Sequence, residues 1–408
     1  MQVTKRDSNH PRSKDVICFF AVCGLVFLSV ILSLATPDIV RAESGGLIRG
    51  NPRIIKGIDL IYNNRLMEAE KLFSKMTVDY PEDPGGYFYL AMVTWSRLAN
   101  GFWGPETVAE FKNRIDRAVR AARRRVERKS PKSFDYFYLG GALGFKARFE
   151  LMQEEYLSSF FLAREAVGLL ESCTRKDPEN KDVLLGLGTF DYYTDQLSGI
   201  LKFLTYWFIR KGSKEDGLRK LEIAADKAVY SASEAKSLLL HIYLFVEKND
   251  ARALSLAGEL AEEFGDNTRY LYLEGVCCIR MGLESRYRDI LKEFINKGSR
   301  ENSHPSAMWW SRRSLYLEAS YELFKGNPGS ARKKLHAVLG RPDMENDPAM
   351  LAWPRIKLGI SYDLEGRRAE AEKYYNRIIK MENASGAQFL AKRLLKNNLK
   401  KDDPFIGY

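Results

Sequence analysis

From Asn51 onward, the apolar residues of this chain recur at intervals of three and four positions, and no run alternates apolar with polar residues. Intervals of three and four place side chains on one face of an α-helix, whereas alternation is typical of a strand. Short polar segments containing Gly, Asn or Pro interrupt the pattern, and such segments favour turns. The pattern therefore predicts an all-α chain of amphipathic helices joined by turns.

The last part of the chain shows how these helices are grouped. Leu358-Gly359 and Tyr362 begin one predicted helix, Ala371 follows twelve residues after the glycine, and Tyr375 comes four residues later. A short polar turn separates the two helices. Small residues such as Gly359 let the helices of a hairpin approach closely, and large ones such as Tyr375 fill the space toward the next hairpin.

The spacing of twelve and then four residues occurs at four other places. They run from Gly57 to Ala69 and Phe73, from His241 to Ala253 and Ala257, from Gly275 to Tyr287 and Leu291, and from Ala319 to Ala331 and Leu335. A fixed period of this kind is the signature of a helical-repeat protein. It resembles the tetratricopeptide-repeat (TPR) pattern of Leu-Gly-x-x-Tyr, then Ala-x-x-x-Phe, then Pro, although His241 and Tyr287 depart from its small residues. The resemblance implies a right-handed superhelix of stacked helical hairpins, an α-solenoid.

Three further hairpins, beginning near Leu90, Leu139 and Leu187, are longer than this unit. We expect insertions between their helices near residues 99–105, 145–158 and 195–213. Residues 50–385 then form about eight hairpins. Residues 386–408 supply a lysine-rich capping helix and tail, because a terminal repeat needs a polar outer face.

The third of these longer hairpins carries a second resemblance. Its segments Gly186–Tyr193, Leu201–Leu204 and Gly212–Leu218 resemble a divergent TPR family with long inter-helix insertions. Eukaryotic members of that family are linked to organelle membranes and to the clearance of protein inclusions. The resemblance implies an adaptor role without identifying a partner.

The first fifty residues contain an export signal. Basic residues between Lys5 and Lys14 precede an uncharged apolar run, residues 16–35, and small residues flank Arg41. These are the parts of a secretory signal peptide, which favours cleavage after Ala42. The apolar run is also long enough for an uncleaved membrane anchor. Under both interpretations residues 1–42 are the leader and residues 43–49 are a short linker. The rest of the chain is then exported, and it is either free in the periplasm or anchored to the membrane and facing its extracytoplasmic side.

Charge and cysteine content add little. The net charge is +11, and a basic exported protein meets anionic lipids, polyanionic wall polymers or acidic partners. Beyond the leader there are three cysteines, Cys173, Cys277 and Cys278. An odd number with two adjacent residues does not form a disulfide framework, so the stability of the fold has to come from packing.

No catalytic constellation is recognisable in the sequence. The four histidines are scattered, and none of the spacings of a zinc site, a nucleophile elbow or a phosphate-binding loop occurs. His241 stands at a small-residue place of its repeat and is interpreted as a core histidine. We therefore expect no enzymatic activity, no metal and no cofactor.

The segment from Pro105 to Lys129 combines an apolar stripe with many arginines. One interpretation is a repeat helix with a solvated basic back. The other is a surface for lipid headgroups or an acidic partner. The arginines concerned are Arg114, Arg117, Arg120, Arg124 and Arg128.

The TPR resemblance also implies where a partner binds, since the first helix of each hairpin lines the concave face in that family. Transferring those positions hairpin by hairpin predicts a groove of mostly aromatic side chains, which are preferred anchors at interfaces. The alternative is that these side chains pack against the insertions. The predicted groove residues are Phe88, Met92, Trp95, Tyr192, Phe245, Tyr272, Tyr316 and Trp353.

These observations predict a non-enzymatic protein–protein interaction scaffold of the cell envelope. The alternative is a module that binds lipid or another hydrophobic ligand through the insertions. The apolar insertion at residues 198–211 is too short to span a bilayer and would pack inside the solenoid, enter a membrane interface or plug the groove. A protein partner is expected and nucleic acid is not, and self-association stays open.

Overall fold

The computed structural model describes most of the chain beyond the leader. The described residues are 40–41, 47–48, 50–153, 155–196, 212–300, 304–340, 347–381 and 384–408. The predicted apolar run 16–35 and the insertion 198–211 lie outside them. Within the described ranges, no helix has both the length and the apolar character needed to cross a bilayer. Two short strands, β1 (Val40–Arg41) and β2 (Leu47–Ile48), pair in antiparallel fashion.

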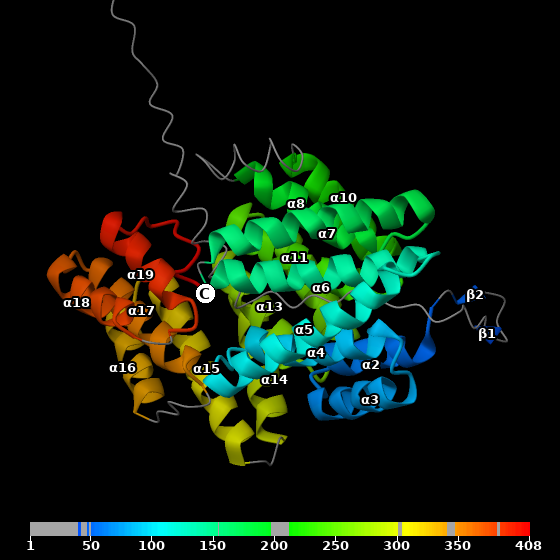
Figure 1. The fold of residues 1–408 in the computed structure, drawn as a ribbon. Coiled ribbons are helices and arrows are strands. Elements are labelled where there is room, and N and C mark those ends of the chain that lie inside the picture. Colours follow the sequence, from blue (N-terminus) through cyan, green and yellow to red (C-terminus); the bar gives the residue numbers. More distant parts are fainter. Residues whose placement is uncertain are drawn as a thin grey trace, which may run out of the picture.

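Helices form all the rest of the described secondary structure, and they pair in chain order (Figure 1). The pairs are α2 (Pro52–Tyr62) with α3 (Leu66–Asp79), α4 (Pro84–Ala99) with α5 (Pro105–Val126), α6 (Ser133–Met152) with α7 (Tyr156–Lys176), α8 (Val183–Gln196) with α10 (Lys214–Lys227), α11 (Ala232–His241) and the π-helical turn η1 (Ile242–Val246) with α12 (Asp250–Glu263), α13 (Thr268–Arg280) with α14 (Glu284–Arg300), α15 (His304–Phe324) with α16 (Pro328–Leu339), and α17 (Ala349–Asp363) with α18 (Arg368–Ile379). A last helix, α19 (Ala387–Lys396), follows them. The prediction of an all-α chain of TPR-like hairpins is confirmed.

The five hairpins with regular spacing share one kind of turn. Each has a single residue with positive φ between its two helices, and these residues are Asn64, Lys248, Gly282, Gly326 and Gly366. In four of them the next residue donates its N–H to a carbonyl five positions back, as Arg367 does to Tyr362 at 2.9 Å. This arrangement is the Schellman ending of a helix, and it fixes the direction in which the second helix leaves.

Close approach of the two helices explains the small residues of the repeat. A Cβ atom at Gly57 would lie 2.0 Å from Cζ of Phe73, and one at Gly359 would lie 2.3 Å from Cε1 of Tyr375. Both aromatic side chains are fully buried. The ring of each second helix therefore occupies the space that a side chain on the first helix would need.

The long hairpins differ from the prediction at residues 145–158. There the additional residues do not form an insertion between helices, because α6 continues to Met152 and α7 begins at Tyr156. Phe145 and Phe149 are buried and continue the apolar face of α6, so the extra residues lengthen both helices. In the α4–α5 pair only residues 100–104 separate the helices.

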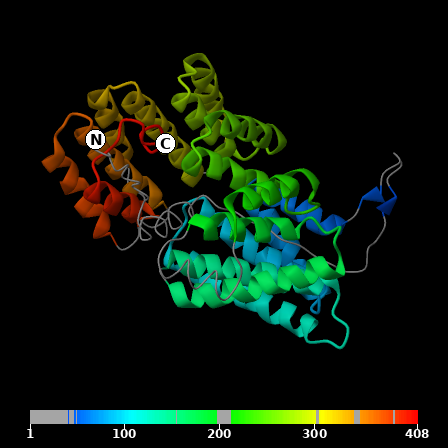
Figure 2. The ribbon, with the colours of Figure 1, turned by 90° about the horizontal axis from the view of Figure 1, so that it is seen from above.

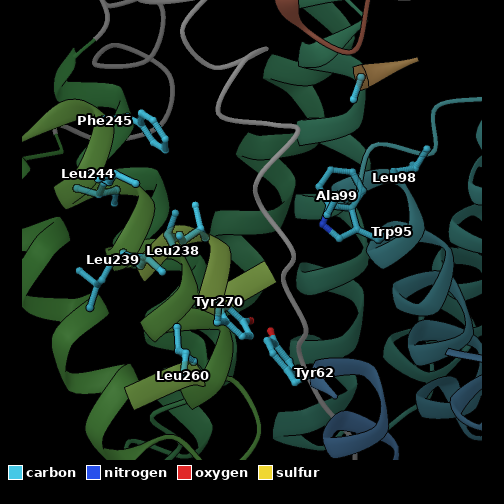
Figure 3. Close-up of a cluster of buried hydrophobic side chains, with 14 of the residues drawn as sticks. Tyr62, Trp95, Leu98, Ala99, Leu238, Leu239, Leu244, Phe245, Leu260 and Tyr270 are labelled. Carbon is cyan, nitrogen blue, oxygen red and sulfur yellow. The ribbon is translucent and has the colours of Figure 1, made fainter. Parts of the chain in front are cut away.

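The superhelix curves until hairpins distant in sequence touch, as seen from above in Figure 2. Tyr62 of α2 donates a hydrogen bond to Oε2 of Glu234 in α11 at 2.6 Å, and Nδ2 of Asn267 donates to the carbonyl of Tyr62 at 2.7 Å. Figure 3 shows Tyr62 facing Tyr270 across this junction. The core is therefore continuous between the first hairpins and the middle of the chain.

The close approach at Gly57 can be tested against a helical glycine with free space around it. Gly57→Ala should lower stability by about 1–3 kcal/mol, because the methyl group overlaps the Phe73 ring. Gly168→Ala in α7, where nothing lies within 4 Å of a Cβ, should raise it by roughly 0.5–1 kcal/mol through helix propensity. Thermal unfolding followed by circular dichroism measures both, and equal melting temperatures would contradict the packing argument.

Candidate functional site

The chain after α19 forms a tail that lies on the inner face of the superhelix and turns twice, with the N–H of Asp403 bound to the carbonyl of Lys400 at 3.1 Å and that of Ile406 to the carbonyl of Asp403 at 3.0 Å. Its last residues contact η1, α13, α15 and α17, which belong to the first halves of four successive hairpins. Phe405 is 2% exposed and Ile406 is 4% exposed. Figure 1 shows the C-terminal end near the centre of the molecule, between α19 and α13. We call the surface of these four elements that covers residues 403–408 the tail groove.

The ring of Phe405 lies between aromatic rings from two helices. Its centroid is 5.4 Å from that of Phe245 in η1 and 6.1 Å from that of Trp353 in α17, and both pairs are close to parallel. The guanidinium of Arg393 in α19 lies over the same ring at 5.3 Å. Stacking and cation–π contacts of this kind add to the burial of an aromatic side chain.

The ring of Tyr408 occupies a second position in the groove. It meets Phe245 at 4.9 Å, Trp353 at 5.5 Å and Tyr272 of α13 at 6.3 Å, each nearly at right angles. Phe245 and Trp353 therefore serve both tail rings. Phe245 belongs to the π-helical turn η1, and such turns often occur at functional sites.

Polar groups at the base of the groove bind the main chain of the tail. Nζ of Lys357 donates to the carbonyls of Phe405 at 2.6 Å and Ile406 at 2.8 Å. The hydroxyls of Tyr316 and Ser320 in α15 donate to a main-chain oxygen of Tyr408 at 3.2 and 3.0 Å. Main-chain oxygens are common to every peptide, so these contacts do not depend on the side chains of the bound segment.

Lys357 is unusual because it is 1% exposed. Burial lowers the pKa of its ammonium group well below the usual value, while the charge of Asp403 in the tail acts in the opposite direction. The ring of Tyr316 lies 5.6 Å from its Nζ. The tail thus supplies both oxygen acceptors of this buried amine.

Beside Tyr408 lies a cavity of about 100 Å³. Its wall includes Tyr272, Tyr316 and Trp353 from the groove, and the cations Arg269 and Arg313. Arg313 pairs with Asp347 through two hydrogen bonds of 2.7 and 3.0 Å. The cavity is therefore continuous with the tail groove.

Of the predicted groove residues, Phe245, Tyr272, Tyr316 and Trp353 come together around the tail. The remaining four lie elsewhere and are buried by the chain itself: Phe88, Met92, Trp95 and Tyr192. Phe88 and Trp95 pack on Phe145, with centroids 6.0 and 5.6 Å apart. Tyr192 donates to Glu247 at 2.6 Å. A binding role for these four stays a prediction, and in this structure none of their side chains faces solvent.

Sequence reasoning missed Lys357, Ser320 and the tail itself. Lys357 stands in a run of apolar residues, and that position was the only available signal. A lysine at a buried helix position needs an oxygen partner, which the spacing of the repeat does not reveal.

Several arginines of α5 and of the turn after it bind side chains of the protein itself. Arg114 pairs with Glu110 at 2.6 Å and with Glu70 of α3, and Arg128 pairs with Glu82 at 2.5 Å. Arg117 lies over the ring of Tyr87. Arg120 and Arg124 are exposed and form no ion pair with the described residues, so the predicted anion-binding surface stays a prediction that rests mainly on these two.

Other candidates for chemistry are buried. The thiols of Cys173, Cys277 and Cys278 are buried, and burial raises the pKa of Cys278 to about 11, so it is a neutral and weak nucleophile at pH 7. In the part of the chain that the structure describes, no cluster of three or more His, Cys, Asp or Glu side chains is arranged to hold a metal ion.

The hairpins and their shared turns define an all-α, TPR-like helical-repeat protein. No protein-family model matches the chain, and no curated protein matches it. Among solved structures, it is similar to the TPR domain of P58(IPK), at 15% sequence identity over 84% of this chain and 97% of that chain, with a TM-score of 0.20.

His241, interpreted from the sequence as a core histidine, is fully buried beside the groove. Its Nδ1 donates to the carbonyl of Ser237 at 2.6 Å, and its ring stacks on Phe245 at 6.1 Å. Burial lowers the pKa of this histidine well below its usual value, and the charge of Arg269 lowers it further.

The lowered pKa of His241 predicts a loss of stability in mild acid. Below about pH 6.5 the unfolded chain binds a proton at this residue and the folded chain does not, so the free energy of unfolding falls by up to about 1.4 kcal/mol per pH unit. His241→Leu should lack this component. Melting temperatures at about pH 7.5 and about pH 5.5 compare the two proteins. A loss in the variant equal to that in the wild type would refute the assignment.

Proposed function

We propose that this protein is a non-enzymatic scaffold whose tail groove binds a short segment of a partner protein. The observation that carries the proposal is that the first helices of four successive hairpins converge on one segment of chain, residues 403–408, which contains a turn from Asp403 to Ile406. These helices contribute aromatic rings for the side chains and donors for the main chain.

The physical basis is the combination of two kinds of contact. Aromatic side chains bury much area at small entropic cost and are therefore frequent interaction hot spots. Main-chain oxygens are bound by Lys357, Tyr316 and Ser320, which fixes the path of the bound main chain. A hydrocarbon chain would leave Lys357 and the Tyr316 hydroxyl without these acceptors, at a cost of about 1–3 kcal/mol each, whereas Ser320 would keep its bond to the carbonyl of Tyr316 at 3.1 Å. The groove therefore suits a peptide better than a lipid tail.

The proposal can be tested by crosslinking and affinity capture from native membrane and soluble fractions, with mass spectrometry of proteins and lipids. A Tyr272→Ala/Trp353→Ala variant should lose at least about tenfold in captured partner, since two anchors of the groove are removed. Phe161→Ala, which removes a 59% exposed ring on α7, is the matched control and should capture normally.

Unchanged capture by a folded Tyr272→Ala/Trp353→Ala protein would contradict the groove as the binding site. Enrichment of lipid with no protein partner would contradict the scaffold itself. Circular dichroism of each variant verifies that the fold is retained.

We also propose that the scaffold works in the cell envelope. Support comes from the sequence alone, from the basic residues and the apolar run that precede residue 42. Residues 1–50 fused to a reporter that is active only outside the cytoplasm should give activity. The same fusion with two charged residues replacing Leu25 and Leu32 should not, and activity in both or in neither would overturn the location.

A further inference from the structure

We infer that the tail groove recognises partner segments with the chemistry of its own residues 403–408, and that the tail competes with them for the site. The sequence of this segment is Asp-Pro-Phe-Ile-Gly-Tyr. The ligand class is thus a peptide that forms a turn, with two aromatic side chains three positions apart and a glycine directly before the second. The inference rests on the proposed function and names the ligand of that same groove.

The spacing of the two aromatic side chains follows from the groove. Phe405 and Tyr408 both contact Phe245 and Trp353, and they approach these rings in different orientations, nearly parallel for Phe405 and nearly perpendicular for Tyr408. Each pocket therefore accepts a flat ring. Because the carbonyls between the two rings are bound by Lys357, the bound segment cannot slide to another register without losing these hydrogen bonds.

The glycine requirement follows from the wall of the groove. A Cβ atom at Gly407 would lie 2.9 Å from Cγ of Arg280 and 3.4 Å from Cγ2 of Ile279. Arg280 is held in place by an ion pair with Asp250 at 2.7 Å, and its side chain is only 8% exposed. Only a residue without a side chain fits here without moving Arg280.

The structure also shows why the tail can leave. After α19 ends at Lys396, residues 397–402 form no helix, and most of them are exposed. Asp402 forms an ion pair with Lys248 at 3.1 Å, in which the lysine side chain is 48% exposed and the aspartate side chain is 73% exposed. Such surface pairs contribute little to stability. The tail is therefore held mainly by the groove and by Arg393 of α19, which pairs with Asp403 at 2.7 Å and lies over the ring of Phe405. A short flexible tether gives its segment an effective concentration on the order of 1 mM.

This tether also explains why the tail occupies the groove of its own chain. A tail from a second copy would bring the same contacts but at the much lower concentration of free protein. An unrelated partner segment displaces the tail only if it binds more tightly or is itself held nearby. The tail thus sets a threshold of affinity for entry into the groove.

The test uses a fluorescent peptide with the sequence of residues 400–408 and measures its binding by anisotropy. The proteins are the full-length chain and a chain that ends at Asp402. If the tail occupies the groove for 90–99% of the time, the truncated chain should bind the peptide about 10- to 100-fold more tightly than the full-length chain.

Peptide variants test the ligand class. Phe405→Ala in the peptide should weaken binding at least about tenfold through loss of an aromatic anchor. Gly407→Val in the peptide should also weaken binding, because the added side chain overlaps Arg280. Lys401→Ala is the matched control, since Lys401 is exposed, and its affinity should stay within about twofold.

If the truncated chain does not fold, the full-length Phe405→Ala/Tyr408→Ala variant replaces it, because it keeps the chain length and weakens only the tail contacts. Failure of the peptide to bind either folded protein would overturn the inference. Equal affinity for full-length and tail-weakened proteins would also overturn it, as would dimers in sedimentation that disappear with the tail.

The proposed function is judged separately. A partner that is captured through Tyr272 and Trp353 but is not displaced by the peptide would leave the scaffold intact and refute the ligand class. A peptide that binds the groove, without capture of any partner protein, would support the ligand class and refute the scaffold.

Discussion

Close packing of the two helices within each hairpin is the constraint on which the rest of the structure depends. Because the ring of Phe73 or Tyr375 occupies the place of a missing side chain on the first helix, the two helices meet at a short and fixed distance. The shared turns then repeat the same exit direction. In a repeat protein, a small constant rotation between neighbouring units determines the curvature of the whole. That curvature brings the first hairpin to the middle of the chain and turns the first helices toward a common inner face.

The part of the fold that could be predicted from sequence is the part determined by local spacing. The interval of twelve and then four residues identified the five regular hairpins because it reflects contacts within one unit. Residues 145–158 were misjudged because a longer hairpin can be made either by a loop or by longer helices, and the periodicity of Phe145 and Phe149 allowed both. The leader and residues 198–211 lie outside the described structure, so their roles stay predictions.

Four of the eight predicted groove residues lie close together because they occupy equivalent positions in successive hairpins. The superhelix brings these positions to one inner face, and the residues are Phe245, Tyr272, Tyr316 and Trp353. In the N-terminal half, Phe111 of α5 and Phe145 of α6 cover Trp95, and Phe145 also covers Phe88, while Tyr192 packs against α10 and bonds to Glu247, so a rule derived from standard repeats does not apply there. The tail could not have been predicted, because its path depends on contacts between segments that share no sequence period.

A groove that is already filled by its own chain changes how quickly a partner can be captured. When a site must first be vacated, the observed association rate rises with partner concentration only until it equals the rate at which the resident segment departs. Beyond that point, more partner does not accelerate capture. The buried amine of Lys357, which loses both of its carbonyl acceptors when residues 405 and 406 leave, slows this departure. Under the proposed function, residues 403–408 therefore limit the rate of complex formation, and their sequence determines that limit.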